Sequence, residues 1–183
     1  ITFSDNTATI NLRDLVGMGN VNQWLTDHGF KQTKVLNGPQ KVELGLLPLQ
    51  QQYGLGMTTP NEMRKLFEMI RDNKAGSAAS CDRMLRVLTH QYWDDDGASQ
   101  IPPWIQIAHK TGAIDGTRSE GSYIFAPSGE ISLAVYTKDQ QDNSWTDSNE
   151  GDVAIRTITR QIWQHYEPQE TWSLPPGAEK LMP

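Results

Sequence analysis

Apolar residues recur at helical spacing in several stretches of the chain, most of them in its first half. Residues three or four positions apart share one face of a helix, so each stretch predicts an amphipathic helix. The clearest start signal is Thr59-Pro60-Asn61-Glu62, a capping box with proline at the first helical position. The predicted helices cover residues 6–16, 20–28, 60–70, 77–91 and 149–166.

A different pattern follows in the second half, where apolar and polar residues alternate over short segments. Alternation places the apolar side chains on one face of a strand, and it predicts strands at 105–111, 121–126 and 131–137. Two stretches show neither pattern. Residues 31–57, rich in glycine and proline, predict a long irregular loop, and residues 93–104 predict a polar loop.

Helices followed by antiparallel strands and a closing helix predict an α+β fold. We expect a mostly helical subdomain at residues 1–104, the strands with the C-terminal helix at 105–166, and an irregular tail at 167–183. With 183 residues, of which 37% are hydrophobic, the chain can form one domain with a sizeable core.

Charge and composition exclude several functions. The net charge of −6 argues against nucleic acid and anionic membrane as partners, and no segment reaches the roughly 18 apolar residues that span a bilayer. The four histidines are isolated and no glycine-rich phosphate loop is present, so we expect no metal and no organic cofactor. The single cysteine, Cys81, excludes an internal disulfide, and its place on an apolar helical stripe predicts a buried thiol.

Two tripeptides carry the strongest chemical signal. Ser4-Asp5-Asn6 leads directly into the first predicted helix, and Lys110-Thr111-Gly112 closes the first predicted strand. In this order and in these surroundings, the two resemble motifs of penicillin-binding proteins and class A β-lactamases. Taken singly, the first is also a favourable helix cap, in which Asp5 anchors the turn, and the second a strand end with a solvated lysine.

The resemblance implies a role for each of five residues. Ser4 would relay a proton to the leaving nitrogen, and Lys110 would hold a positive charge beside it. Asn6 would recognise a substrate amide, and Thr111 would hydrogen-bond the substrate carboxylate. The backbone N–H of Ala113 would be one donor of the oxyanion hole.

Arg118 and Glu43 are weaker candidates. Arg118 could be a second contact for the substrate carboxylate, because a guanidinium binds a carboxylate bidentately; a surface pair with Glu120 is the alternative. Class A enzymes carry Glu-x-x-Leu-Asn in an Ω loop, where the glutamate activates the deacylating water. The Ω-like loop 31–57 lacks that sequence, so Glu43 is either a shifted general base or a solvated loop residue.

The third family motif, Ser-x-x-Lys, supplies the nucleophile, and no serine or threonine here has a lysine three positions later. The resemblance therefore implies a β-lactamase/transpeptidase-like fold whose N-terminal part is missing, and this chain alone is predicted to be inactive. We expect an open sheet edge and uncovered apolar helix faces. A complementary N-terminal segment or a swapped homodimer would cover them.

Three functions stay open at this point. The first is a parent serine hydrolase, periplasmic or secreted, that cleaves a β-lactam or peptidoglycan-like amide through an acyl-enzyme. The second is a penicillin-binding, DD-peptidase-like protein or sensor with slow deacylation, which the missing Glu-x-x-Leu-Asn favours. The third is a non-catalytic remnant, which the missing Ser-x-x-Lys favours.

Overall fold

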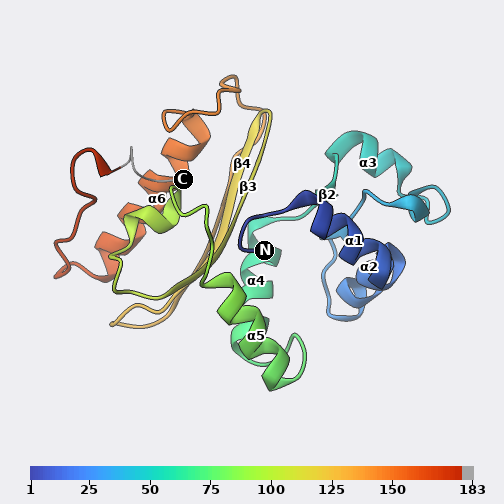
Figure 1. Cartoon of the computed structure of the whole chain (residues 1–183), viewed down its shortest axis with the longest axis horizontal. Helices are drawn as coiled ribbons and strands as arrows, with labels where there is room; N and C mark the ends of the chain where they lie inside the picture. The colour runs from blue at the N-terminus through green and yellow to red at the C-terminus, as the bar shows by residue number, and fades with distance from the viewer. Residues whose placement is uncertain (179–183) are drawn as a thin grey trace. The chain divides into compact units, whose positions relative to one another are not determined.

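The computed structural model describes residues 1–178, and their contacts divide the chain into two compact units, whose elements Figure 1 labels. The helical unit is Ser4–Glu62, and the sheet unit combines Ile1–Phe3 with the chain from Met63 onward. The boundary between the two units lies near residue 62 and not at the expected residue 104, because the helices at Pro60–Arg71 and Ala78–Leu88 pack on the sheet.

Two helices open the helical unit, close to the positions that the apolar pattern predicts. They are α1 at Asn6–Val16 and α2 at Met18–Asp27. The Asp5 carboxylate caps α1 by accepting a hydrogen bond from the backbone N–H of Ala8 at 2.5 Å, which confirms its expected anchoring role. Gly17 separates the two helices with a φ of 86°, a left-handed conformation that glycine adopts without strain.

The stretch predicted to be an irregular loop contains short regular elements. Strands β1 (Lys34–Val35) and β2 (Gly56–Met57) pair antiparallel and enclose the 3₁₀ helix η1 (Pro39–Lys41) and the helix α3 (Leu47–Tyr53). Both helices have proline in their first turn, where its missing N–H is tolerated. The prediction missed these elements because they are too short to develop a periodic pattern.

Glu62 holds the start of this stretch in place. Its carboxylate accepts hydrogen bonds from the backbone N–H groups of Lys31 and Gln32 and from the hydroxyl of Thr33, at 2.6–3.1 Å. Burial alone would raise the pKa of Glu62, but these hydrogen bonds outweigh it and lower the pKa below its usual value. The ionised carboxylate therefore stabilises this loop at neutral pH.

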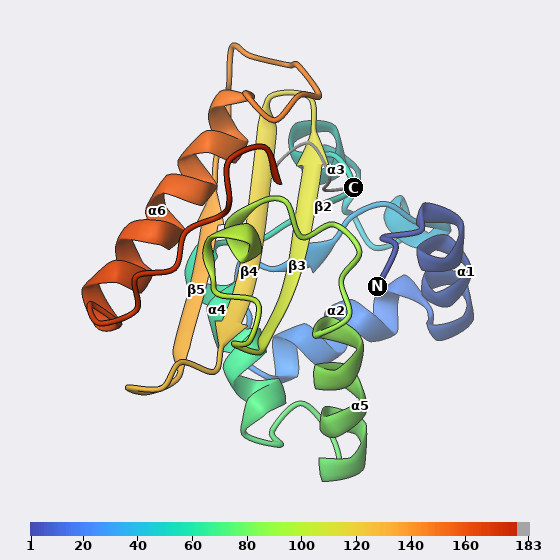
Figure 2. The same cartoon turned by 60° about the vertical axis from the view of Figure 1, so that its left-hand side comes forward.

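Three antiparallel strands form the centre of the sheet unit (Figure 2). They are β3 (Ile107–Ile114), β4 (Thr117–Ile124) and β5 (Ile131–Tyr136), in that order across the sheet. The strands β3 and β4 extend further toward the turn that joins them than predicted, because their pairing continues to a tight turn at Asp115-Gly116. Gly116 has a φ of 72°, which this kind of hairpin turn requires.

Helices cover both faces of this sheet (Figures 1 and 2). The helices α4 (Pro60–Arg71) and α5 (Ala78–Leu88) pack on one face, and α6 (Glu150–Tyr166) packs on the other. The first face buries Phe67, Ile70, Cys81, Leu88, Ala108 and Tyr123. The second face buries Ile101, Ile124, Ala126 and Trp163. The predicted burial of Cys81 is confirmed, because its side chain is fully enclosed.

The segments beside α6 complete the sheet unit. The 3₁₀ helix η2 (Gly97–Gln100) lies within the predicted polar loop, and its first three residues are buried. Asn149 caps α6, as the predicted helix start requires. The tail is irregular over residues 167–178, and its last five residues, 179–183, lie outside the described part of the chain. Among residues 1–178, no helix combines the length and the apolar character needed to cross a membrane.

Candidate active site

The lysine motif lies on β3, at one edge of the sheet. Within the described part of the chain β3 pairs only with β4, so its outer edge has no neighbouring strand. Side chains alternate along the strand: Lys110 shares the face of Ala108, toward α4 and α5, whereas Thr111 lies opposite Glu120 on the α6 side. The motif thus presents a cation and a hydroxyl beside an unpaired strand edge.

Lys110 is half-buried, and its ammonium group donates a hydrogen bond to the carbonyl of Thr111 at 2.6 Å. Removal from water disfavours the charged form and lowers the pKa of Lys110 below its usual value. The nearby Glu120 carboxylate favours the charged form and only partly offsets this effect. Because an ammonium group has three donors, Lys110 keeps the capacity to bind an anion that approaches the strand.

Behind the motif, Glu120 belongs to a buried polar cluster that the sequence pattern does not reveal. Its Oε2 accepts a hydrogen bond from the backbone N–H of Gly97 at 2.6 Å, and its Oε1 lies 3.4 Å from Nδ1 of His109. The Glu120 and His109 side chains are each 4% exposed. Thr159 of α6 closes the cluster, because a Cβ on Gly97 would lie 2.7 Å from its Oγ1. Since His109 directly precedes Lys110, the cluster anchors the strand that carries the motif.

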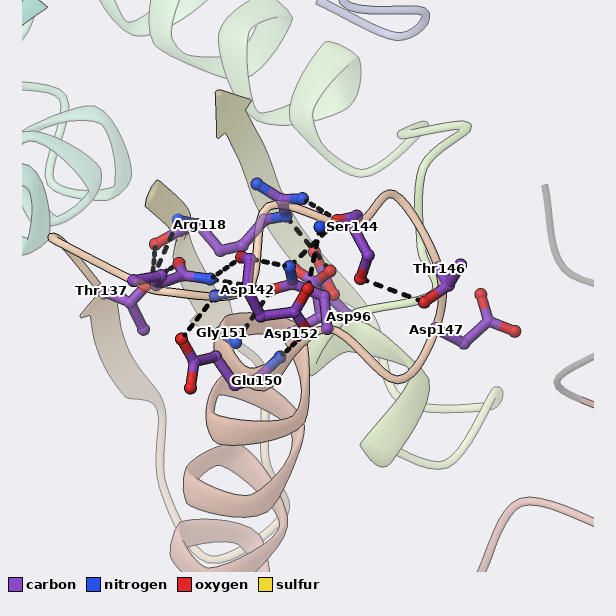
Figure 3. A network of polar contacts seen from close by, with 12 residues as sticks. Asp96, Arg118, Thr137, Asp142, Ser144, Thr146, Asp147, Glu150, Gly151 and Asp152 are labelled. Carbon is purple, nitrogen blue, oxygen red and sulfur yellow. Dashed lines mark hydrogen bonds and ion pairs between the residues drawn. The ribbon is translucent and has the colours of Figure 1, made fainter. Parts of the chain in front are cut away.

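Arg118 lies on β4, but its guanidinium is enclosed within the sheet unit (Figure 3). It donates hydrogen bonds to the carbonyls of Ile114 and Ser144 at 2.7 and 2.6 Å, and to Oδ2 of Asp152 at 3.2 Å. The alternative of an exposed pair with Glu120 is wrong, because both side chains are buried and have other partners. In this position the guanidinium joins the β3–β4 hairpin to the segment that leads into α6.

Acidic side chains gather around this guanidinium (Figure 3). Burial raises the pKa of Asp96 to about 7, and the carboxylates of Asp152 and Glu120 add to the rise. Arg156 opposes it, with its Nη1 3.7 Å from Oδ1 of Asp96. Burial also raises the pKa of Asp152, and Arg118 opposes that shift. Among residues 1–178, no group of three or more acidic, histidine or cysteine side chains is arranged to hold a metal ion.

The serine motif lies at the start of α1, in the helical unit. Ser4 and Asn6 are exposed on either side of the capping Asp5. Ser4 has a φ of 53°, a left-handed conformation that is uncommon for a residue other than glycine. The structure thus brings Lys110, Thr111 and Ala113 together on β3, and it places Ser4 and Asn6 in the other unit. Glu43 also belongs to the helical unit, in an exposed turn between η1 and α3.

The order of the elements agrees with a known family. A model of the β-lactamase enzyme family matches residues 1–166, which is most of the chain. The chain belongs to the β-lactamase enzyme family. A search of curated proteins found no match.

Several solved structures with the β-lactamase fold match most of this chain. The structure of PBP-A matches 92% of the chain with 25% identity and a TM-score of 0.73, and a β-lactamase from Sphaerobacter thermophilus DSM 20745 matches 95% with 26% identity and a TM-score of 0.74. A class A β-lactamase from Bacteroides cellulosilyticus DSM 14838 matches 90% with 20% identity and a TM-score of 0.70. The chain spans 58%, 61% and 61% of these three proteins. The predicted α+β, β-lactamase/transpeptidase-like fold class is confirmed.

Proposed function

We propose that this chain supplies the substrate-binding and proton-relay side of a serine β-lactamase-like hydrolase. The observation that carries the proposal is a half-buried cation, Lys110, which donates to the backbone carbonyl of Thr111 on a strand whose outer edge has no partner strand within the described residues. An extended substrate can align along such an edge through backbone hydrogen bonds. Family membership and the similarity to PBP-A and a β-lactamase support a β-lactam or a peptidoglycan-like amide as the substrate.

In this proposal each motif residue has one task. The substrate carboxylate accepts hydrogen bonds from Lys110 and Thr111, and the charge on the ammonium strengthens them. The backbone N–H of Ala113 stabilises the oxyanion that forms when the amide carbonyl is attacked. Ser4 passes a proton to the leaving nitrogen, and Asn6 holds the substrate amide. The lowered pKa of Lys110 brings it closer to neutral pH, where proton exchange with its neighbours is easier.

The nucleophile and its base would come from a Ser-x-x-Lys segment that this sequence does not contain. The serine oxygen would attack the amide carbonyl and expel the amine as Ser4 protonates it, which leaves an ester between serine and substrate. Water would then hydrolyse that ester and release the free acid. We accordingly propose that residues 1–183 alone are inactive, and that the parent protein is periplasmic or secreted, as its family suggests.

A second candidate is a penicillin-binding, DD-peptidase-like protein or sensor that is acylated but hydrolyses its ester slowly. The exposed position of Glu43, in a loop without Glu-x-x-Leu-Asn, favours it, because no carboxylate is held there to activate water. Glu43 as a general base would require a different conformation of that turn. A non-catalytic remnant is the third candidate, and the acylation test below separates it from the other two.

We further propose that a complementary N-terminal segment or a swapped homodimer covers part of this chain. The helix α1 buries none of its side chains, although it carries four large apolar residues. They are Ile10, Leu12, Leu15 and Val16, which are 44%, 62%, 83% and 51% exposed. The strand β5 pairs only with β4 within the described residues, so its other edge also has no partner strand. Exposed apolar helix faces and open strand edges favour association.

The test is intact-protein mass spectrometry after incubation with a reactive penicillin, on this chain and on the longest obtainable parent. We expect an adduct of one acyl group on the parent and none on residues 1–183. An adduct that persists for hours would favour the slow-deacylation candidate, and one that disappears within minutes would favour a β-lactamase. Absence of an adduct on both proteins would contradict the hydrolase and the sensor and leave the remnant.

A further inference from the structure

We propose a second ligand site in the sheet unit, which binds a small molecule with one carboxylate and a flat apolar body. The site is a cavity of about 340 Å³ between α6, the η2 segment and the C-terminal tail, and none of its lining residues belongs to β3. Figure 1 shows the tail, in red, running beside α6. The proposal does not depend on the hydrolase function, because it uses none of the motif residues.

One wall of the cavity is a single face of α6. Arg156, Arg160 and Gln164 stand four residues apart and therefore lie in a row along the helix, with Trp163 beside them. The other walls come from three segments. The first contributes Asp95 and the η2 residues Ser99 and Gln100, the loop before α6 contributes Asp147, and the tail contributes Trp172, Ser173 and Leu174.

The two arginines differ in whether their guanidinium groups already have partners in the fold. Arg156 donates to the backbone carbonyl of Asp147 and lies 3.7 Å from the Asp96 carboxylate, so the fold already holds it. Arg160 is exposed, and no hydrogen bond or ion pair joins its guanidinium to another residue of the described chain. A guanidinium binds a carboxylate through two parallel hydrogen bonds, so Arg160 is the anchor that the cavity offers to an anionic group.

Trp172 supplies the accessible apolar surface. It is partly exposed and lines the cavity from the tail, so a flat apolar body against its ring would bury surface that is otherwise partly in contact with water. Trp163 also lines the cavity, but it is 2% exposed and its Nε1 is closed to solvent. Trp163 therefore contributes to the shape of the cavity and offers no hydrogen bond to a ligand.

The charge of the lining limits the ligand to one negative group. Asp95 and Asp147 face the same cavity as the two arginines, so a second negative charge on the ligand would meet a carboxylate. Phosphorylated or dicarboxylic molecules are therefore poor candidates. An aromatic monocarboxylate fits both the single free arginine and the partly exposed ring of Trp172.

Indole-3-propionate is a suitable probe, because it joins a flat aromatic body to one carboxylate. The full chain, labelled with ¹⁵N, is titrated while NMR follows the indole N–H signals of its six tryptophans, assigned by single Trp→Phe variants. We expect saturable shifts of the Trp163 and Trp172 signals, with the other four nearly unchanged. Tryptamine, which carries an ammonium in place of the carboxylate, is expected not to shift them.

Arg160→Gln tests the anchor, and Arg83→Gln is the matched control, an exposed arginine on α5 that gives the same change of charge. We expect Arg160→Gln to weaken binding about tenfold, as loss of a charge-assisted pair predicts, and Arg83→Gln to leave it unchanged. Dispersed NMR signals of both variants verify folding. Equal binding to Arg160→Gln, equal binding of tryptamine, or no shift at Trp163 and Trp172 would each overturn the proposal.

Discussion

At the scale of single residues, the sheet unit holds an unusual amount of charge in its interior. Arg118 and Glu120 are 2% and 4% exposed, and both come from one strand, β4. Buried charges are tolerated when hydrogen bonds or opposite charges satisfy them. The Ser144 carbonyl accepts from Arg118 and the Gly97 N–H donates to Oε2 of Glu120, whereas Oε1 of Glu120 has no hydrogen bond within residues 1–178. Asp96 differs, because its carboxyl is buried near other acids and its pKa is about 7. Two predictions follow from this interior.

Asp96→Asn should change how stability depends on pH. The pKa of Asp96 is about 7 in the native state, against 3.8 for the ordinary side chain. Between these pH values the folded form therefore binds one more proton than the unfolded form. The contribution of Asp96 to stability is complete below pH 3.8 and is lost as the pH rises toward 7. Asparagine does not titrate. Between pH 4 and pH 7.5, the free energy of unfolding of Asp96→Asn, taken relative to that of the natural chain, should therefore rise by on the order of 1–3 kcal/mol.

Urea unfolding of Asp96→Asn and of the natural chain at a series of pH values measures the difference between their free energies of unfolding. Asp94→Asn, an exposed position in the same acidic run, is the control for the loss of one carboxylate. A constant difference between Asp96→Asn and the natural chain over that range would contradict the raised pKa of Asp96.

Gly97→Ala should destabilise the sheet unit. The added Cβ would lie 2.7 Å from Oγ1 of Thr159 and 2.9 Å from Oε2 of Glu120, closer than atoms can approach. Either η2 or α6 must then shift, at a cost of roughly 1–3 kcal/mol for overpacking in a filled interior. Thermal unfolding measures the loss. Gly76→Ala is the matched control, because its Cβ would meet only side-chain atoms at 3.7 Å or more. Equal stability of the two variants would show that the cluster around Glu120 is loosely packed.

At the scale of elements, periodicity predicts what is long and amphipathic, and it misses what is short or covered on both faces. The helices α1, α5 and α6 begin where caps and apolar stripes place them. The helix α3 is missed, because seven residues scarcely show a period. The start of β4 is missed for a different reason. Its residues Thr117–Glu120 are polar, yet Arg118 and Glu120 are buried, because α6 and the segments beside it cover that face of the strand.

Asp5→Ala should destabilise α1 through the loss of its cap. The Asp5 carboxylate satisfies the Ala8 N–H, which alanine leaves without a partner at the exposed helix start. We expect a loss of about 1 kcal/mol in the stability of the helical unit, measured by circular dichroism during urea unfolding. Asp5→Asn should recover most of it, because asparagine caps helices about as well. Equal losses for alanine and asparagine would show that the cap contributes nothing and that Asp5 acts through its charge.

At the scale of the whole molecule, the sequence identified the family through two tripeptides, and the family match and the fold agree with it. The surroundings of the candidate site were less accessible. His109 and Glu120 stand on adjacent strands, and only their register places the two side chains on one face of the sheet. Arg118 carries the same lesson: the residue type suits a substrate carboxylate, but the fold directs its donors to the carbonyls of Ile114 and Ser144 and to the carboxylate of Asp152. Residue type and spacing do not specify such long-range contacts.

The apolar surface of α1 leads to a prediction about association. Leu15 is 83% exposed, and a large apolar side chain so placed favours contact with another chain. We expect residues 1–183 to self-associate as concentration rises, in sedimentation velocity experiments, and Leu15→Lys to reduce this. Val42→Lys, at a site that is 67% exposed in the same unit, is the control and should leave association unchanged. A monomer at every concentration would contradict the swapped homodimer and leave the complementary N-terminal segment as the partner of α1.

In the proposed function, Lys110 contacts the reacting substrate of the parent hydrolase. The most direct test is the second-order rate constant for acylation of the parent by a fluorescent penicillin, compared between Lys110→Gln and Lys138→Gln. Lys138 is 86% exposed, so its variant gives the same change of charge without touching the site. We predict that Lys110→Gln lowers the rate constant about a hundredfold or more and that Lys138→Gln leaves it unchanged. Acylation of Lys110→Gln at the natural rate would contradict the account.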